Sequence, residues 1–167
     1  MDEPATPTSE PPDWVPPLIL MADHGHSWQS FVAAVYAVFR RDFIASQPRF
    51  RGKYVRCRRD PIYDGKEAAF WHCTSEGRTE DERIPDIRRC ERIEWVRAII
   101  ENCLDKRIDT WETDKRGDLR CYLWFNEEFL VALGNRARSW QLITAFCTER
   151  EHNKRKLRQE REECQNG

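Results

Sequence analysis

The sequence predicts an α+β fold in which N-terminal helices precede a four-stranded antiparallel meander sheet and a C-terminal helix closes the chain. Between residues 27 and 103, apolar residues recur at the three- or four-residue spacing of amphipathic helices. Four strand-like runs follow, and the connections between them are short enough to join only neighbouring antiparallel strands. The final run, from Thr148 onward, is highly charged and helical by propensity.

One domain is expected from the 167 residues, of which 40% are hydrophobic and 34% are charged. Residues 1–25 are Pro-rich and acidic and predict a flexible tail, which leaves residues 26–167 as a single α+β domain. The formal net charge is −1, but all 28 Lys and Arg lie after residue 39, against 24 of the 29 acids. This mildly basic domain is compatible with a polyanionic partner without arguing for one.

The first helix is predicted to start after Ser27, a good N-cap residue, and to end near Pro48. Residues 49–59 carry six basic residues and no acid, and from Lys53 onward they alternate like a strand or edge strand. Two interpretations of this basic stretch stay open. Its charges could guard an exposed edge against aggregation, or they could extend a path for RNA.

The next helix is predicted over residues 85–103, after a polar, acidic loop. On this helix Arg89 lies within the apolar stripe, in line with Ile93 and Val96. A buried guanidinium is costly unless it is paired. Arg89 should therefore either meet a carboxylate inside the protein or face a site that anions can enter.

The four strands are predicted at residues 108–115, 118–125, 129–135 and 139–147. Arg120, Tyr122 and Trp124 share one face of the second strand, because side chains alternate along a strand. Basic and aromatic side chains interleaved on a sheet are typical of RNA binding, since rings stack on unpaired bases and cations meet phosphates. The alternative is a second layer, with these rings packed beneath a helix. The last helix is equally compatible with a solvated helix held by ion pairs.

Several functional classes are disfavoured by the sequence. The seven cysteines stand singly, without the paired spacing of a zinc site, so we expect no metal and no cofactor. No P-loop, GxGxxG, GxSxG or HExxH motif occurs. The acidic N-terminus lacks the basic region of a signal peptide, and no apolar run approaches the ~20 residues that span a bilayer. We expect a cytoplasmic protein with free thiols and no membrane association.

Two histidines have neighbours that suit chemistry. His72 is flanked by Trp71 and followed by two hydroxyl residues, and His152 lies in the basic final helix. Either could be a structural or surface residue. If functional, an imidazole could accept a proton from a ribose 2′-hydroxyl or give one to a leaving 5′-oxygen. The cations that would then stabilise the phosphate are Arg89, Lys115, Lys154 and Lys156.

Five segments together resemble one known family. They are FWHCTSEG, RIPDIRRCERIEWVRAIIEN, WETDKRGDLRCYLWF, FLVALGN and QLITAFCTEREHNKRKLRQE. They resemble the phage-associated branch of the barnase, EndoU, colicin E5-D and RelE-like (BECR) nucleases, over about residues 66–163. The resemblance implies two helices ahead of a four-stranded antiparallel sheet, and a toxin-like, metal-independent ribonuclease. It also implies RNA, for example tRNA, as the partner, together with a cognate inhibitor protein.

The resemblance also assigns roles to residues. It implies His72 or His152 as acid or base, Thr144 as a positioning hydroxyl, and Arg89 with Lys156 on the phosphate. About 65 residues precede the matching part, whereas such domains usually end a larger phage or toxin polypeptide. The residues expected to bind substrate are Lys115, Arg120, Tyr122, Trp124, Lys154 and Lys156.

The first functional expectation is thus a ribonuclease that cleaves RNA by 2′-hydroxyl attack. The alternative is a non-catalytic RNA- or protein-binding factor of a phage or mobile element. The environment of Arg89 distinguishes the two. A guanidinium locked by an internal carboxylate such as Glu128 or Glu112, with both histidines distant, favours binding. Sequence offers no prediction of the oligomeric state.

Overall fold

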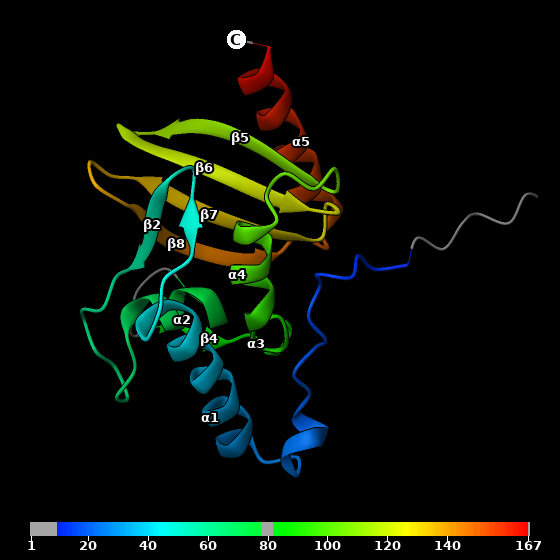
Figure 1. Cartoon of the computed structure of the whole chain (residues 1–167). Coiled ribbons are helices and arrows are strands. Elements are labelled where there is room, and N and C mark those ends of the chain that lie inside the picture. Colours follow the sequence, from blue (N-terminus) through cyan, green and yellow to red (C-terminus); the bar gives the residue numbers. More distant parts are fainter. Residues whose placement is uncertain (1–9, 78–81, 167) are drawn as a thin grey trace, which may run out of the picture.

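The computed structural model describes residues 10–77 and 82–166 (Figure 1). Its helices are η1 (Met21–His24), α1 (Trp28–Phe39), η2 (Arg40–Ile44), α2 (Ala68–Thr74), α3 (Ile87–Glu91), α4 (Ile93–Glu101) and α5 (Glu151–Gln165). Its strands are β1 (Arg49–Phe50), β2 (Lys53–Cys57), β3 (Ser75–Glu76), β4 (Ile84–Pro85), β5 (Ile108–Lys115), β6 (Asp118–Phe125), β7 (Phe129–Asn135) and β8 (Trp140–Cys147). The first nine residues of the expected tail and residues 78–81 of the expected acidic loop lie outside the described chain.

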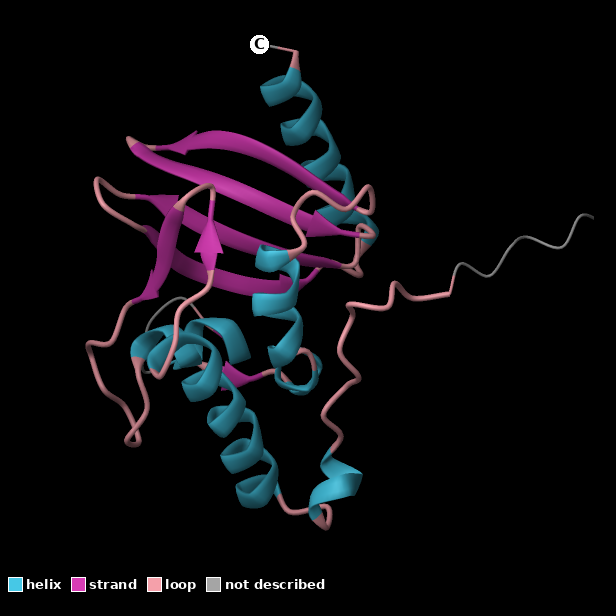
Figure 2. Cartoon of the chain, in the orientation of Figure 1, coloured by secondary structure: helices cyan, strands magenta, loops and turns pink. Residues whose placement is uncertain are grey.

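The predicted α+β class is confirmed, but a four-stranded meander is only part of the main sheet. Strands β5 to β8 form that meander, and β2 adds to it in parallel beside β8, with β1 at the outer edge (Figure 2). The basic stretch thus supplies two further strands. They turn at Arg51 and Gly52, both with positive φ, as a two-residue hairpin requires.

The sheet buries both of its faces. One face carries Leu123, Val131 and Leu133 into the main core, together with Val96 of α4 and Phe31 of α1. The opposite face carries an aromatic cluster, which is covered by α5 on the other side of the sheet (Figure 1). The cluster consists of Trp111, Tyr122, Trp124, Leu130 and Ala132, with Leu157 of α5. The interpretation of a second layer therefore holds where α5 crosses the sheet.

The predicted helix over residues 85–103 is interrupted. Arg92 has φ −104° and ψ 18°, so α3 ends and α4 begins at this residue. Its backbone N–H donates to the carbonyl of Arg89 at 3.1 Å, an i→i−3 bond that tightens the last turn of α3. Arg89 therefore lies on α3, whereas Ile93 and Val96 lie on α4.

The N-terminal segment contacts the core from Trp14 onward, so the expected flexible tail does not extend to residue 25. The indole of Trp14 donates to Asp105 at 3.0 Å and packs on Phe125 with ring centroids 5.1 Å apart. The N–H of Ile19 donates to the carbonyl of Glu91 at 3.0 Å. Apolar side chains between the prolines account for this docking, because their burial favours the folded segment. The predicted cap of α1 is present, since the Ser27 hydroxyl accepts the N–H of Ser30.

Candidate functional site

Arg89 is held inside the protein by backbone carbonyls and carboxylates. Only 13% of its side chain is exposed. Its Nη1 donates to the carbonyl of Ser75 at 2.7 Å, and its Nη2 and Nε lie 3.5 Å from the carboxylates of Glu76 and Asp86. These carboxylates are not the ones proposed from the sequence, because Glu112 instead pairs with Arg51 on the surface. The guanidinium thus has internal partners, the first of the two outcomes expected for it.

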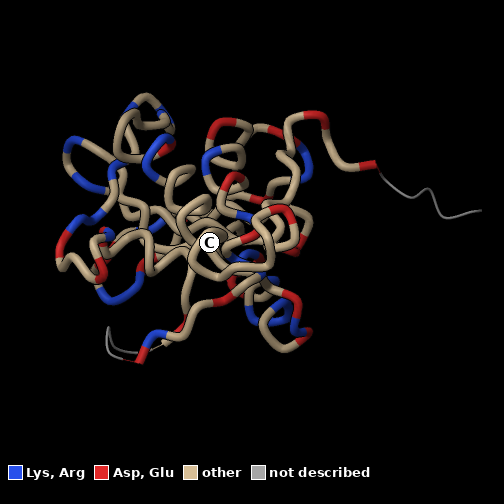
Figure 3. The backbone as a smooth tube through the Cα atoms, turned by 90° about the horizontal axis from the view of Figure 1, so that it is seen from below, with Lys and Arg blue, Asp and Glu red and all other residues tan. Residues whose placement is uncertain are grey.

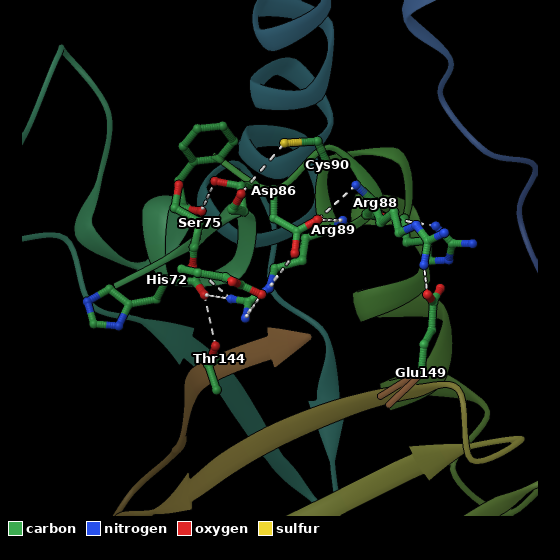
Figure 4. A network of polar contacts seen from close by, with 12 residues as sticks. His72, Ser75, Asp86, Arg88, Arg89, Cys90, Thr144 and Glu149 are labelled. Carbon is green, nitrogen blue, oxygen red and sulfur yellow. Dashed lines mark hydrogen bonds and ion pairs between the residues drawn. The ribbon is translucent and has the colours of Figure 1, made fainter. Parts of the chain in front are cut away.

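Thr144 and Arg89 meet at the backbone of His72, not at its imidazole (Figure 4). The Thr144 hydroxyl donates to the His72 carbonyl at 2.8 Å, and Arg89 Nη1 lies 3.4 Å from the same oxygen. The imidazole points away from this junction. These contacts tie the end of α2 to the part of β8 that β2 does not cover. Their geometry suits a structural clasp between helix and sheet.

His152 does not join these residues. It is exposed in the first turn of α5, and it lines neither of the cavities described below. The four residues expected to be catalytic therefore fall into separate places. Arg89 and Thr144 hold a backbone carbonyl, while the two imidazoles have different surroundings.

The imidazole of His72 instead lines a pocket of about 280 Å³ at the end of the main sheet. We call it the arginine pocket, defined by Arg58, His72, Asp118, Arg120, Arg136 and Gln141. Its walls come from five separate chain segments: the connection after β2, α2, β6, the turn after β7, and β8. Arg83 also contacts His72, because its Nη2 lies 3.1 to 3.2 Å from the ring nitrogens of His72.

One carboxylate organises two of these arginines. Asp118 accepts hydrogen bonds from Arg120 Nε and from Arg136 Nη1, each at 2.8 Å, and Arg136 Nε donates to Gln141 at 3.0 Å. The hydrogen bond from Arg120, with Arg136 beside it, holds the pKa of Asp118 below its usual range. Among the described lining residues Asp118 is the one acid facing three arginines, so the pocket keeps an excess of positive charge.

Gly134 makes room for one of these guanidiniums. In the β6–β7 register Gly134 lies opposite Arg120, and a Cβ at this position would meet Arg136 Nη1 at 2.7 Å. The absence of a side chain lets the Arg136 guanidinium lie flat on β7 beside Arg120. Sequence reasoning identified Arg120 and His72 but missed Arg58, Arg136 and Gly134. The alternation of side chains along β6 places Arg120 on one face of the sheet. This pattern does not identify the residues of other strands that lie beside Arg120.

A second cavity, of about 630 Å³, lies between α5 and the same face of the sheet. We call it the α5 groove, lined by Thr113, Lys115, Tyr122, Phe146, Lys156 and Glu160, with further residues of α5. Glu160 accepts hydrogen bonds from Lys115 at 2.6 Å and from Thr113 at 2.8 Å. The helix itself is anchored on the sheet by Arg158 to Glu127 and by Arg161 to Asp109.

The residues expected to bind substrate are divided by the structure. Lys115, Tyr122 and Lys156 line the α5 groove, and Arg120 lines the arginine pocket. Trp124 has no exposed surface, and its indole donates to the buried Thr148 hydroxyl at 2.8 Å, so it cannot stack on a base in this conformation. Lys154 lines neither cavity. Lys and Arg are interspersed with Asp and Glu over the molecule (Figure 3), so the arginine pocket is a local feature.

Other chemistries find little support in the described part of the chain. No cluster of three or more His, Cys, Asp or Glu there could hold a metal ion. Burial raises the pKa of Cys73, Cys90 and Cys121 to about 12, so these thiols are protonated and poor nucleophiles near neutral pH. None of the described helices combines the length and the apolar character needed to cross a membrane.

No known protein family, no curated protein and no solved structure matches this chain.

Proposed function

We propose that this protein binds RNA, with a backbone phosphate held in the arginine pocket. The observation that carries the proposal is that Arg58, Arg120 and Arg136 line one pocket together with His72, and that Asp118 holds two of these arginines in place. A planar guanidinium matches phosphate oxygens two at a time, and phosphate contacts supply much of the affinity for nucleic acids.

The hydrogen-bonding capacity of the pocket suits an anion. A guanidinium has five N–H donors, and Arg120 uses its Nε on Asp118. The remaining N–H groups can contact a ligand while Asp118 keeps the two guanidiniums in place. Preorganised donors of this kind lose less conformational entropy on binding.

Binding without cleavage is the better supported of the two functions expected from the sequence. Arg89 donates to the carbonyl of Ser75 at 2.7 Å and lies 3.5 Å from the carboxylates of Glu76 and Asp86, so its guanidinium already has partners in the absence of RNA. Thr144 is likewise committed to a backbone carbonyl. Arg89 and Thr144, the residues that the resemblance to BECR nucleases implied beside His72, contact its backbone carbonyl and not its imidazole (Figure 4).

RNA cleavage at the same pocket is a second candidate, because the His72 imidazole would lie beside a phosphate bound by the arginines. In that reaction the imidazole would accept the 2′-hydroxyl proton while Arg120 and Arg136 stabilise the charge on the phosphate. The resemblance to BECR nucleases stays a prediction.

The proposal is tested by titrating a fluorescently labelled single-stranded RNA and following its anisotropy at several salt concentrations. Arg120→Ala and Arg136→Ala should weaken binding across RNA sequences, and each should reduce the salt slope by about 0.7. The matched control is Lys106→Ala, which removes an exposed cation at the opposite end of the β5–β8 meander. Affinity and salt slope equal to wild type in both arginine variants would contradict the proposal.

The same RNA, incubated with and without EDTA, separates the two candidates. Products ending in a 2′,3′-cyclic phosphate that form with EDTA present, and that disappear in His72→Ala, would support cleavage. Intact RNA in a sample that binds it supports binding alone.

A further inference from the structure

We propose that the α5 groove holds an unpaired base of the RNA whose phosphate occupies the arginine pocket, which makes single-stranded RNA the ligand. The inference rests on the proposed function and deepens it. It is carried by two differences between neighbouring cavities: the arginine pocket has an excess of positive charge, and the α5 groove is balanced in charge and has aromatic walls.

The balance of charge in the groove suits a neutral group. Its described lining contains the amines of Lys115 and Lys156 and the carboxylates of Glu160 and Glu163. One of these amines is already neutralised, since Lys115 lies 2.6 Å from Glu160. A phosphate would gain little binding energy in this groove, because the carboxylates would repel it about as strongly as the amines attract it. An uncharged base is subject to neither effect.

The walls of the groove offer what a base requires. The rings of Tyr122 and Phe146 form apolar surfaces on the sheet side, and the side-chain amides of Asn153 and Gln159 lie on the helix side. Unpaired bases are recognised by stacking on such rings and by hydrogen bonds to their polar edges. The volume of about 630 Å³ is in the range typical of small-molecule sites.

Each cavity has a lining residue on the same strand, β6. Arg120 of the arginine pocket and Tyr122 of the α5 groove are two positions apart on β6, so their side chains share a face and lie roughly 7 Å apart along the strand. A strand of RNA can therefore contact both cavities without leaving this face.

The position of α5 beside the groove favours an unpaired base over paired RNA. Helix α5 forms one side of the groove and is held to the sheet by the ion pairs of Arg158 with Glu127 and of Arg161 with Asp109. A base inside the groove has its edges directed at protein side chains, so it cannot pair with a second strand at the same time. In duplex RNA the bases are paired and the protein contacts the outside of the helix, so a duplex offers no free base that could enter the groove.

The test compares three ligands of equal length: a single-stranded RNA, the same chain made wholly abasic, and the RNA as a duplex. Wild-type protein should bind the single strand at least tenfold more tightly than either of the others. Lys156→Ala should weaken binding of the single strand and leave binding of the abasic chain unchanged. Lys154→Ala is the matched control, because it removes the same charge from α5 outside the groove.

A second variant, Cys164→Trp, fills the groove from α5 and should reduce the preference for RNA over the abasic chain. Circular dichroism would verify that this variant keeps its fold. If wild-type protein bound RNA and the abasic chain equally tightly, and Arg120→Ala lost affinity for both, base binding in the α5 groove would be refuted. The proposed function would still hold. Absence of binding to any of the three ligands would refute the proposed function itself.

Discussion

Gly134→Ala tests the arginine pocket without changing any charge. The new Cβ would lie 2.7 Å from Arg136 Nη1, so the guanidinium must move by roughly 0.8 Å to regain ordinary contact. That movement lengthens the 2.8 Å bond to Asp118 and the 3.0 Å bond to Gln141. If the displaced guanidinium makes one charge-assisted hydrogen bond fewer to the phosphate, the binding free energy falls by about 1.5 kcal/mol, or roughly tenfold in RNA affinity.

The same substitution should leave the fold almost unperturbed. Replacing a strand glycine by alanine restricts the unfolded chain and adds about 0.4–1 kcal/mol of stability, which offsets the weakened hydrogen bonds. We expect the urea midpoint to change little while RNA anisotropy reports the weaker complex. RNA affinity equal to wild type, with Arg136→Ala also unchanged, would refute the reasoning. A large loss of stability would instead show that the Arg136 side chain cannot move aside.

Three further substitutions test the rest of the structure by urea unfolding. Arg89→Met should cost about 1–3 kcal/mol because the carbonyl of the buried Ser75 loses its hydrogen bond, with the exposed Arg88→Met as control, and RNA affinity should be unchanged in the folded variant. Trp124→Phe should cost about 0.5–1.5 kcal/mol, because the buried Thr148 hydroxyl loses the indole N–H that it accepts and keeps only its bond to the carbonyl of Glu127, whereas Trp28→Phe at the surface should cost little. The hydrogen bond from Arg158 holds the pKa of the Glu127 carboxyl below its usual range. The ionised carboxylate therefore stabilises the fold above about pH 4.5, and this stabilisation is lost as the pH falls. In Glu127→Gln the free energy of unfolding should depend less steeply on pH in the acid range.

The strands of the meander and the cap of α1 could be predicted from the sequence, because the patterns that indicate them are local. The runs at residues 108–115, 118–125 and 129–135 have the bounds of β5, β6 and β7, since alternation and short turns define a meander without reference to distant residues. The Ser27 cap depends on a residue three positions away. The parallel pairing of β2 with β8 was not readable, because these strands lie more than 80 residues apart in the sequence.

Arg89 shows how far helix-wheel reasoning extends. The wheel correctly predicted that its side chain is buried, although the predicted helix over residues 85–103 is divided at Arg92. The partners of its guanidinium come from β3 and from the cap of α3, and no periodicity identifies them. The prediction that a buried guanidinium needs a carboxylate was sound. Which carboxylate it meets depended on how the chain brings β3 and the N-cap of α3 beside Arg89.

By itself, the sequence determined the α+β class, the meander, the first and last helices, and the presence of His72 and Arg120 among chemically interesting residues. Only the tertiary structure decided which side chains share a cavity. The arginine pocket draws on five chain segments, and its geometry depends on Gly134 leaving room for Arg136. Local patterns record the preferences of neighbouring residues, whereas a pocket arises from packing between segments that the sequence keeps far apart.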